Sequence, residues 1–205
     1  MSHTRLTDSA PFHLPRLLDE RGRPDFRDVY GWLLPRSKRL DVAVTRIRLS
    51  TLDLGRGELD AVRSIRLLLA EINAVQLDAE AHGVMLREDK RETLYALSRR
   101  LSDGVIEVRS APLGGWSPDF SIFHDLDGPA VVLIGPHWFE RPFPHRGPAF
   151  AALHGVDAAV DALRRFDEAW EKAHDIGPAV LSILERAERA ERLVPQGSQL
   201  TSSVH

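Results

Sequence analysis

The stretch Ala130-Val-Val-Leu-Ile134, followed by Gly135-Pro136-His137-Trp138, decides how the fold is interpreted. Five consecutive apolar residues that end at Gly-Pro are typical of a short buried strand. Polar residues follow at once, among them Glu140, Arg141 and His145. Because α/β domains place ligands outside the carboxyl ends of their strands, we expect a candidate site just past this stretch.

The composition indicates one globular domain. The chain has 205 residues, 43% of them hydrophobic, with 14 Gly and 13 Pro, which is enough for one core. The formal charge of −3 argues against a protein that coats nucleic acid non-specifically, although a local basic patch remains compatible with it. The chain has no cysteine, which excludes disulfides, thiolate metal sites and thiol nucleophiles.

The sequence carries no signal for a membrane. No apolar run approaches the roughly 20 residues of a membrane span, and residues 1–10 lack the apolar core of a signal peptide. We therefore expect a cytoplasmic protein that does not associate with membranes.

The chain divides into three expected parts. Residues 1–24 contain scattered Pro and Gly and predict a flexible N-terminal arm, and residues 25–176 carry the domain. Residues 177–205 predict a C-terminal helix that begins near Pro178, followed by a disordered tail. That helix could contact a protein partner or dock within the chain through Leu181, Leu184, Ala187 and Leu193.

Residues 40–50 predict a strand with an informative alternation. Val42, Val44, Arg46 and Arg48 fall on one face, which turns from apolar to cationic toward the end of the strand. The two adjacent guanidinium groups could bind an anionic ligand. Alternatively, they could form ion pairs with nearby carboxylates. The carboxylates in question are Asp53 and Glu58.

The other elements follow from periodicity and turn residues. Helices are expected at 25–35, 88–101, from about 149, from 156 and from 178, and strands at 105–109, 119–124 and 130–134. Residues 57–83 allow two interpretations, since the apolar period favours one long helix while Ile65–Ala70 alone could be a buried strand.

Three features occur in a familiar order: Asp127-Gly128 between two predicted strands, Gly135 after the second strand, and a later helix that ends in Arg165-Phe-Asp-Glu-Ala-Trp170. Over residues 25–176 this order resembles one half of the phospholipase D superfamily. The resemblance implies an α/β fold with a mixed β-sheet flanked by helices. It also implies a homodimer, since single-half members of that family usually pair two copies to build their cleft.

The catalytic motif of that family is altered here. The family carries His-x-Lys-x4-Asp-Gly and then Gly-Ser-x-Asn, and the His and Lys positions are Phe120 and Ile122 in this chain. The Ser and Asn positions are Pro136 and Trp138. Since the reaction needs an imidazole to attack phosphorus and Lys and Asn to hold the phosphate oxygens, the resemblance implies a catalytically degenerate member or a rebuilt site.

The expected function is a degenerate module that binds a phosphate-bearing ligand such as nucleic acid, in a bacterial regulatory or defence role. One alternative is an active phosphodiesterase or nuclease that uses His137 and His145, and another is a non-catalytic assembly protein. Two histidines and one carboxylate of this set could hold a divalent metal, but the histidine spacings match no metal motif, so no metal or other cofactor is expected. The candidate ligand-binding residues are Arg46, Arg48, Arg109, His124, Trp138, Glu140 and Arg141.

Overall fold

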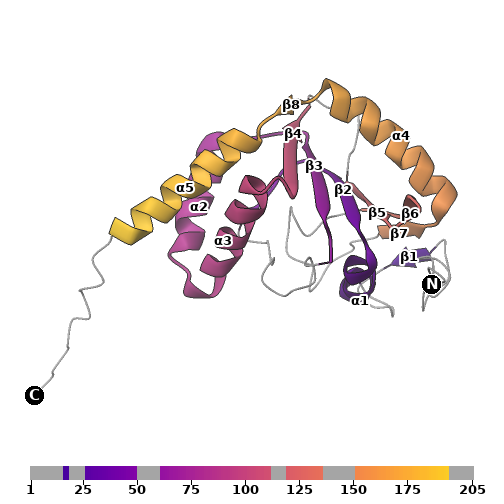
Figure 1. Ribbon diagram of the computed structural model, residues 1–205, viewed down its shortest axis with the longest axis horizontal. Helices are drawn as coiled ribbons and strands as arrows, with labels where there is room; N and C mark the ends of the chain where they lie inside the picture. Colours follow the sequence, from indigo (N-terminus) through magenta and orange to yellow (C-terminus); the bar gives the residue numbers. More distant parts are fainter. Residues whose placement is uncertain (1–15, 19–25, 50–60, 112–118, 136–150, 194–205) are drawn as a thin grey trace, which may run out of the picture.

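The computed structural model describes residues 16–18, 26–49, 61–111, 119–135 and 151–193. In these ranges the chain forms one mixed β-sheet with helices against both of its faces (Figure 1). The expected α/β class with a mixed sheet flanked by helices is therefore confirmed. No helix in the described part is long and apolar enough to cross a membrane.

The described strands form one eight-stranded sheet in the order β1-β7-β6-β5-β2-β3-β4-β8. They are β1 Arg16–Leu18, β2 Arg39–Val44, β3 Ser64–Leu69, β4 Ile106–Ser110, β5 Phe120–His124, β6 Pro129–Ile134, β7 Ala151–His154 and β8 His174–Asp175. The three central strands β2, β3 and β4 are parallel, and all other neighbours pair antiparallel.

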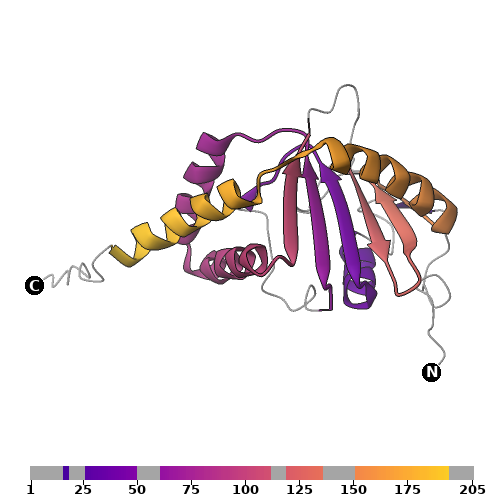
Figure 2. The same ribbon diagram turned by 45° about the horizontal axis from the view of Figure 1, so that its top comes forward.

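The helices divide between the two faces. They are α1 Phe26–Leu33, which continues into the 3-10 turn η1 Leu34–Arg36, then α2 Ala74–Met85, α3 Glu88–Ser102, α4 Val156–Lys172 and α5 Gly177–Leu193. Among the helices of the described ranges, α4 is the one that crosses the first face, while α2, α3 and α5 pack together on the other side of the molecule (Figures 1 and 2). The expected C-terminal helix is thus part of the fold, with Leu184 and Ala187 buried inside the chain.

Each face of the sheet has its own core. On β3, Leu67 and Leu69 face the larger core, which also receives side chains of α1, α2 and α5. Leu68 points the other way, into a smaller core that contains Phe166 and Trp170 of α4. Because the central strands are buried on both faces, their sequences are nearly continuous apolar runs.

The structure resolves the ambiguity in residues 57–83. Ser64–Leu69 form β3, paired with β2 and β4, and Ala74–Met85 form α2. A single long helix is therefore wrong over the described part of this range, whereas the buried strand within it is confirmed. The helical period was misleading because apolar residues that face both cores satisfy several periodicities at once.

Three further segments differ from expectation. The strand expected over 40–50 ends at Val44, so Arg46 and Arg48 do not continue its face. Ala151–His154 form β7 rather than part of a helix that begins near residue 149. Within the expected arm, Arg16–Leu18 form β1, which pairs with β7.

Phe166 should be the most costly residue to truncate on α4. It is 0% exposed, its ring stacks on Trp170 at 5.5 Å, and it meets Phe120 edge-on at 6.4 Å. We expect Phe166→Ala to lower the free energy of unfolding by about 3–5 kcal/mol, measured by urea denaturation. Val160→Ala on the same helix, at a side chain that is 50% exposed, should change it by less than about 0.5 kcal/mol. Equal losses would contradict this assignment of the smaller core.

Candidate functional site

Several strands bring their ends to one edge of the sheet. Beyond β2 and β3, backbone hydrogen bonds continue from Ala70 N to Val44 O and from Glu71 N to Thr45 O. Phe120 pairs with both Ala43 and Ile134, so β6 ends at this same edge. The edge where parallel strands end is the usual ligand side of an open α/β sheet, so it is the first place to look for a site.

A pocket of about 250 Å3 lies at this edge. It is bounded by the residues after β2 and β3 and by the first turns of α2. Its lining consists of Arg46, Ile47, Glu71, Ile72, Asn73, Gln76, Leu77 and Glu80. Asn73 caps α2, since its side-chain oxygen accepts a hydrogen bond from Gln76 N at 3.0 Å.

The charges of the pocket are mixed. Glu80 is held in place, because its carboxylate accepts hydrogen bonds from Leu49 N at 3.0 Å and from Gln76 Nε2 at 3.1 Å. Arg46 is exposed and, among the described lining residues, is the only cation, against the carboxylates of Glu71 and Glu80. A ligand here meets a guanidinium and the N-terminal end of α2 on one side and carboxylates on the other.

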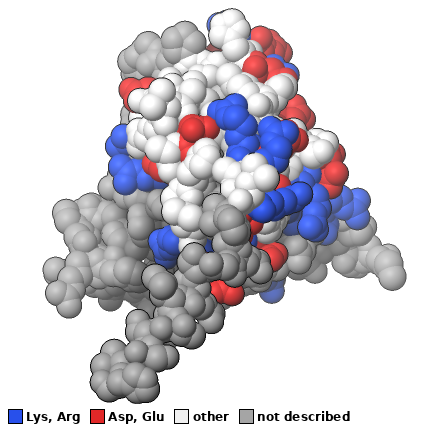
Figure 3. Space-filling view, turned by 90° about the vertical axis from the view of Figure 1, so that its left-hand side faces the viewer, with Lys and Arg blue, Asp and Glu red and all other residues white. Residues whose placement is uncertain are grey.

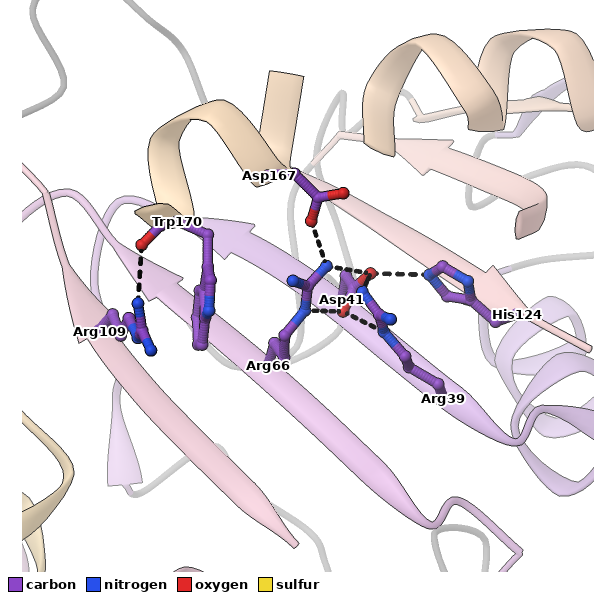
Figure 4. A network of polar contacts seen from close by, with 7 residues as sticks. All are labelled: Arg39, Asp41, Arg66, Arg109, His124, Asp167 and Trp170. Atoms are coloured by element: carbon purple, nitrogen blue, oxygen red, sulfur yellow. Dashed lines mark hydrogen bonds and ion pairs between the residues drawn. The ribbon is translucent and has the colours of Figure 1, made fainter. Parts of the chain in front are cut away.

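A second group of polar residues centres on Asp41, which is 0% exposed (Figure 4). Arg39 and Arg66 each donate two hydrogen bonds to its carboxylate, at 2.7 to 3.0 Å. His124 Nε2 lies 2.7 Å from Asp41 Oδ2, and Arg66 also donates to Asp167 Oδ1 of α4 at 2.7 Å. We call these five residues the Asp41 network.

The network controls the ionisation of its own members. Burial alone would raise the pKa of Asp41, but hydrogen bonds from His124, Arg66 and Arg39 outweigh burial and hold that pKa well below its usual range. Burial would lower the pKa of Arg66, but the hydrogen bonds and charges of Asp41 and Asp167 raise it above the usual value. Asp41 is therefore permanently ionised in the folded protein near neutral pH.

The Asp41 network holds the structure together instead of presenting groups to a ligand. A carboxylate offers about four lone-pair positions, and Asp41 already accepts five hydrogen bonds from within the chain. His124 is 5% exposed and belongs to this network, so its imidazole does not line an open cleft. Arg66 also stacks on Phe166 and Trp170, with its guanidinium 4.7 Å and 5.2 Å from the two ring centroids.

The structure does not gather the described candidate residues at one place. Arg109 stacks over Trp170 at 4.6 Å and donates to its carbonyl at 3.0 Å, on the α4 side of the sheet (Figure 4). Arg46 lines the pocket on the α2 side, and Arg48 follows it, partly buried. The remaining candidates lie outside the described residues: His137, Trp138, Glu140, Arg141 and His145.

The two positions that correspond to the His and Lys of the family motif are part of the interior. Phe120 is 8% exposed and Ile122 is 0% exposed, and both belong to the core beneath α4. The backbone favours glycine at positions 128 and 135, the two glycine positions of the motif, because their φ angles are 133° and 137°. Residues with L side chains rarely adopt such angles. The backbone features of the motif are thus present, while apolar side chains occupy the His and Lys positions.

Sequence reasoning missed Asp41, Arg66 and Asp167. Asp41 was detectable as a lone charge inside the apolar run from Leu40 to Val44, since a buried charge must have partners. Its partners were not detectable, because they lie on other strands and on α4. No group of three or more potential metal ligands occurs in the described ranges.

The Asp41 network generates a prediction about stability. Asp41→Asn leaves Arg66 without its buried counter-charge, so we expect a loss of about 3–5 kcal/mol in the free energy of unfolding at pH 7. Asp167→Asn removes a partner that is 44% exposed and should cost about 1 kcal/mol or less. Similar costs for both variants would show that Asp41 is not the centre of the network.

The same network predicts a pH dependence. The folded pKa of Asp41 is depressed, so its contribution is complete above the pKa of an unfolded Asp, about 3.9, and declines as the pH falls below that value. The stability difference between the wild type and Asp41→Asn should therefore be constant from pH 7 to about pH 5 and shrink below about pH 4. Urea denaturation across this range measures it, and a difference that grows on acidification would contradict the assignment.

Comparison with known proteins gives matches among solved structures. No protein-family model matches the sequence, and no curated protein matches it. The chain is similar to Nuc, a phospholipase D family member from Salmonella typhimurium, with a TM-score of 0.46 and 12% identity over 78% of this chain and 95% of that one. It is also similar to phosphatidylserine synthase from Haemophilus influenzae, with a TM-score of 0.42 and 12% identity over 82% of this chain. The match covers 43% of the synthase, less than half of its length.

Proposed function

We propose that this protein is a catalytically degenerate phospholipase D-like module that binds a phosphate-bearing ligand at the edge where β2, β3 and β6 end. We infer the binding site from Arg46, an exposed side chain that lines the pocket at this edge. In this proposal the protein has a regulatory role and does not catalyse a reaction on its ligand.

The loss of catalysis rests on the motif positions. A phosphorus-attacking imidazole must reach its substrate, and Phe120 and Ile122 offer no nucleophile and no cation. Both side chains are buried against the core of α4, where Phe120 packs on Phe166. Nowhere in the sequence does a Lys stand two residues after a His. The usual chemistry of the family therefore has no counterpart in these residues.

The phosphate preference rests on residue types at the edge. Arg46 is exposed there, and a guanidinium binds phosphate oxygens through paired N–H donors. The backbone N–H groups at the start of α2 favour an anion as well. Glu71 and Glu80 oppose the entry of several phosphate groups into the pocket, so we expect the ligand, an oligonucleotide included, to place a single phosphate group there.

The first test concerns catalysis. We expect wild-type protein to hydrolyse bis(p-nitrophenyl) phosphate no faster than the double variant His137→Ala plus His145→Ala, because neither version has the nucleophile of the family. The release of p-nitrophenolate is measured by absorbance. Turnover in the wild type that disappears in the double variant would establish the alternative, an active phosphodiesterase with a rebuilt histidine site.

The second test concerns binding. Fluorescence anisotropy with a fluorescein-labelled single-stranded oligonucleotide measures affinity and its salt dependence. Arg46→Ala plus Arg48→Ala should weaken binding by about tenfold, equivalent to about 1.4 kcal/mol, and reduce the salt slope by about 0.7 for each phosphate group that the variant no longer neutralises.

The control for this test is Arg164→Ala, which removes one positive charge, against two in the double variant, from an exposed side chain that pairs with Glu168 on α4. It should leave the affinity unchanged, and circular dichroism should confirm that all variants fold. Failure of the wild type to bind the oligonucleotide, or equal decreases in affinity in the double variant and the control, would favour the assembly-protein alternative.

A further inference from the structure

Helix α2 is apolar on two opposite faces. Its inner face buries Leu77, Ala81, Val84 and Met85 against the rest of the chain. A helix with apolar residues all around is normally enclosed on every side. Here the opposite face is open, with Val75 82% exposed and Leu86 76% exposed.

The exposed apolar residues form one stripe. Val75, Ala79, Gly83 and Leu86 are all exposed and are spaced by four, four and three residues, which places them on one side of a helix. Ile72, which is 36% exposed and also lines the pocket, lies two residues before the helix, next to the N-terminal end of this row. We call these five residues the α2 stripe.

The neighbouring charged residues lie beside the α2 stripe and are engaged within the chain. Asp78 accepts a hydrogen bond from Arg186 of α5 at 2.8 Å, and Glu80 accepts one from the backbone of Leu49. Figure 3 shows the side of the molecule on which α2, α3 and α5 lie, with basic and acidic side chains interspersed around a broad area without charge.

We propose that the α2 stripe is a self-association surface, on which α2 of a second copy of this chain packs antiparallel. In this antiparallel pair, Ala79 of one copy lies opposite Ala79 of the other. Val75 of one copy then faces Gly83 of the other, and Leu86 faces Ile72. A Cβ atom added at Gly83 would meet nothing within 4 Å, so there is open space for the side chain of Val75. Large and small side chains therefore alternate across the contact, as close packing of two helices requires.

Charge at the two ends selects the antiparallel direction. Glu71 precedes the stripe and Arg87 follows it, and both are exposed. An antiparallel pair brings Glu71 of one copy near Arg87 of the other at both ends, whereas a parallel pair would bring like charges together. This surface meets the ligand site proposed above at Glu71 and Ile72, which line the pocket, but self-association does not depend on that site being correct.

Sedimentation velocity at several protein concentrations tests the proposal. The wild type should show a concentration-dependent dimer, and Leu86→Glu should raise its dissociation constant by at least about tenfold. Leu126→Glu is the matched control, since Leu126 is 60% exposed in the β5–β6 turn. It should leave the dissociation constant unchanged.

Gly83→Gln separates association from folding. Replacing a helical Gly whose surroundings are open should keep or raise the thermal stability of the monomer, because Gln is the better helix former. The same change fills the space that receives Val75 and should weaken the dimer by at least about tenfold.

A mixing experiment identifies the partner as a second copy. Glu71→Lys and Arg87→Glu should each dissociate the dimer, and an equimolar mixture of the two variants should associate again, since opposite charges then meet at both ends. A wild type that is monomeric at all concentrations would overturn the proposal. So would a dimer that all α2 variants leave intact, which would indicate pairing through another surface.

Discussion

The fold depends on one charged group, Asp41, in the middle of the sheet. A carboxylate at 0% exposure is tolerated only with full hydrogen bonding, and its donors come from β2, β3 and β5. Asp41 pairs in register with Arg66 on one side and with Ile122 on the other. A slip of one residue in either pairing would leave a buried charge without its partner, so the network specifies the register of the central strands.

The same network determines how α4 covers the sheet. Arg66 and Arg109 extend from β3 and β4 to the aromatic rings and the polar groups at the end of α4. Phe166 and Trp170 thereby complete the core that contains Phe120. This face is closed by packing at the positions where the resembled family has its His and Lys. The packing that stabilises α4 on the sheet therefore also buries these two positions.

The local pattern of the sequence predicted β4, β5, β6, α3 and α4 closely, because alternation and turn residues act over a few positions. It did not predict β1 and β7, since such short edge strands depend on partners far away in the chain. Arg109 and His124 were suitable ligand groups by residue type. Their actual partners, Trp170 and Asp41, are 61 and 83 residues away in the sequence, and only tertiary structure identifies them.

While Phe166 and Trp170 of α4 are buried, α2 carries the exposed apolar side chains of Val75 and Leu86 and borders the pocket at the edge of the sheet. The described residues that line the pocket include one cation and two carboxylates, a poor balance for a phosphate group by itself. The α2 stripe ends at this pocket, since Ile72 belongs to both and Glu71 is beside it. In the antiparallel pair, Arg87 of the second copy approaches Glu71 and offsets its charge at the rim of the pocket. Self-association and phosphate binding would then favour each other by the same coupling free energy, because linkage between two binding equilibria is reciprocal.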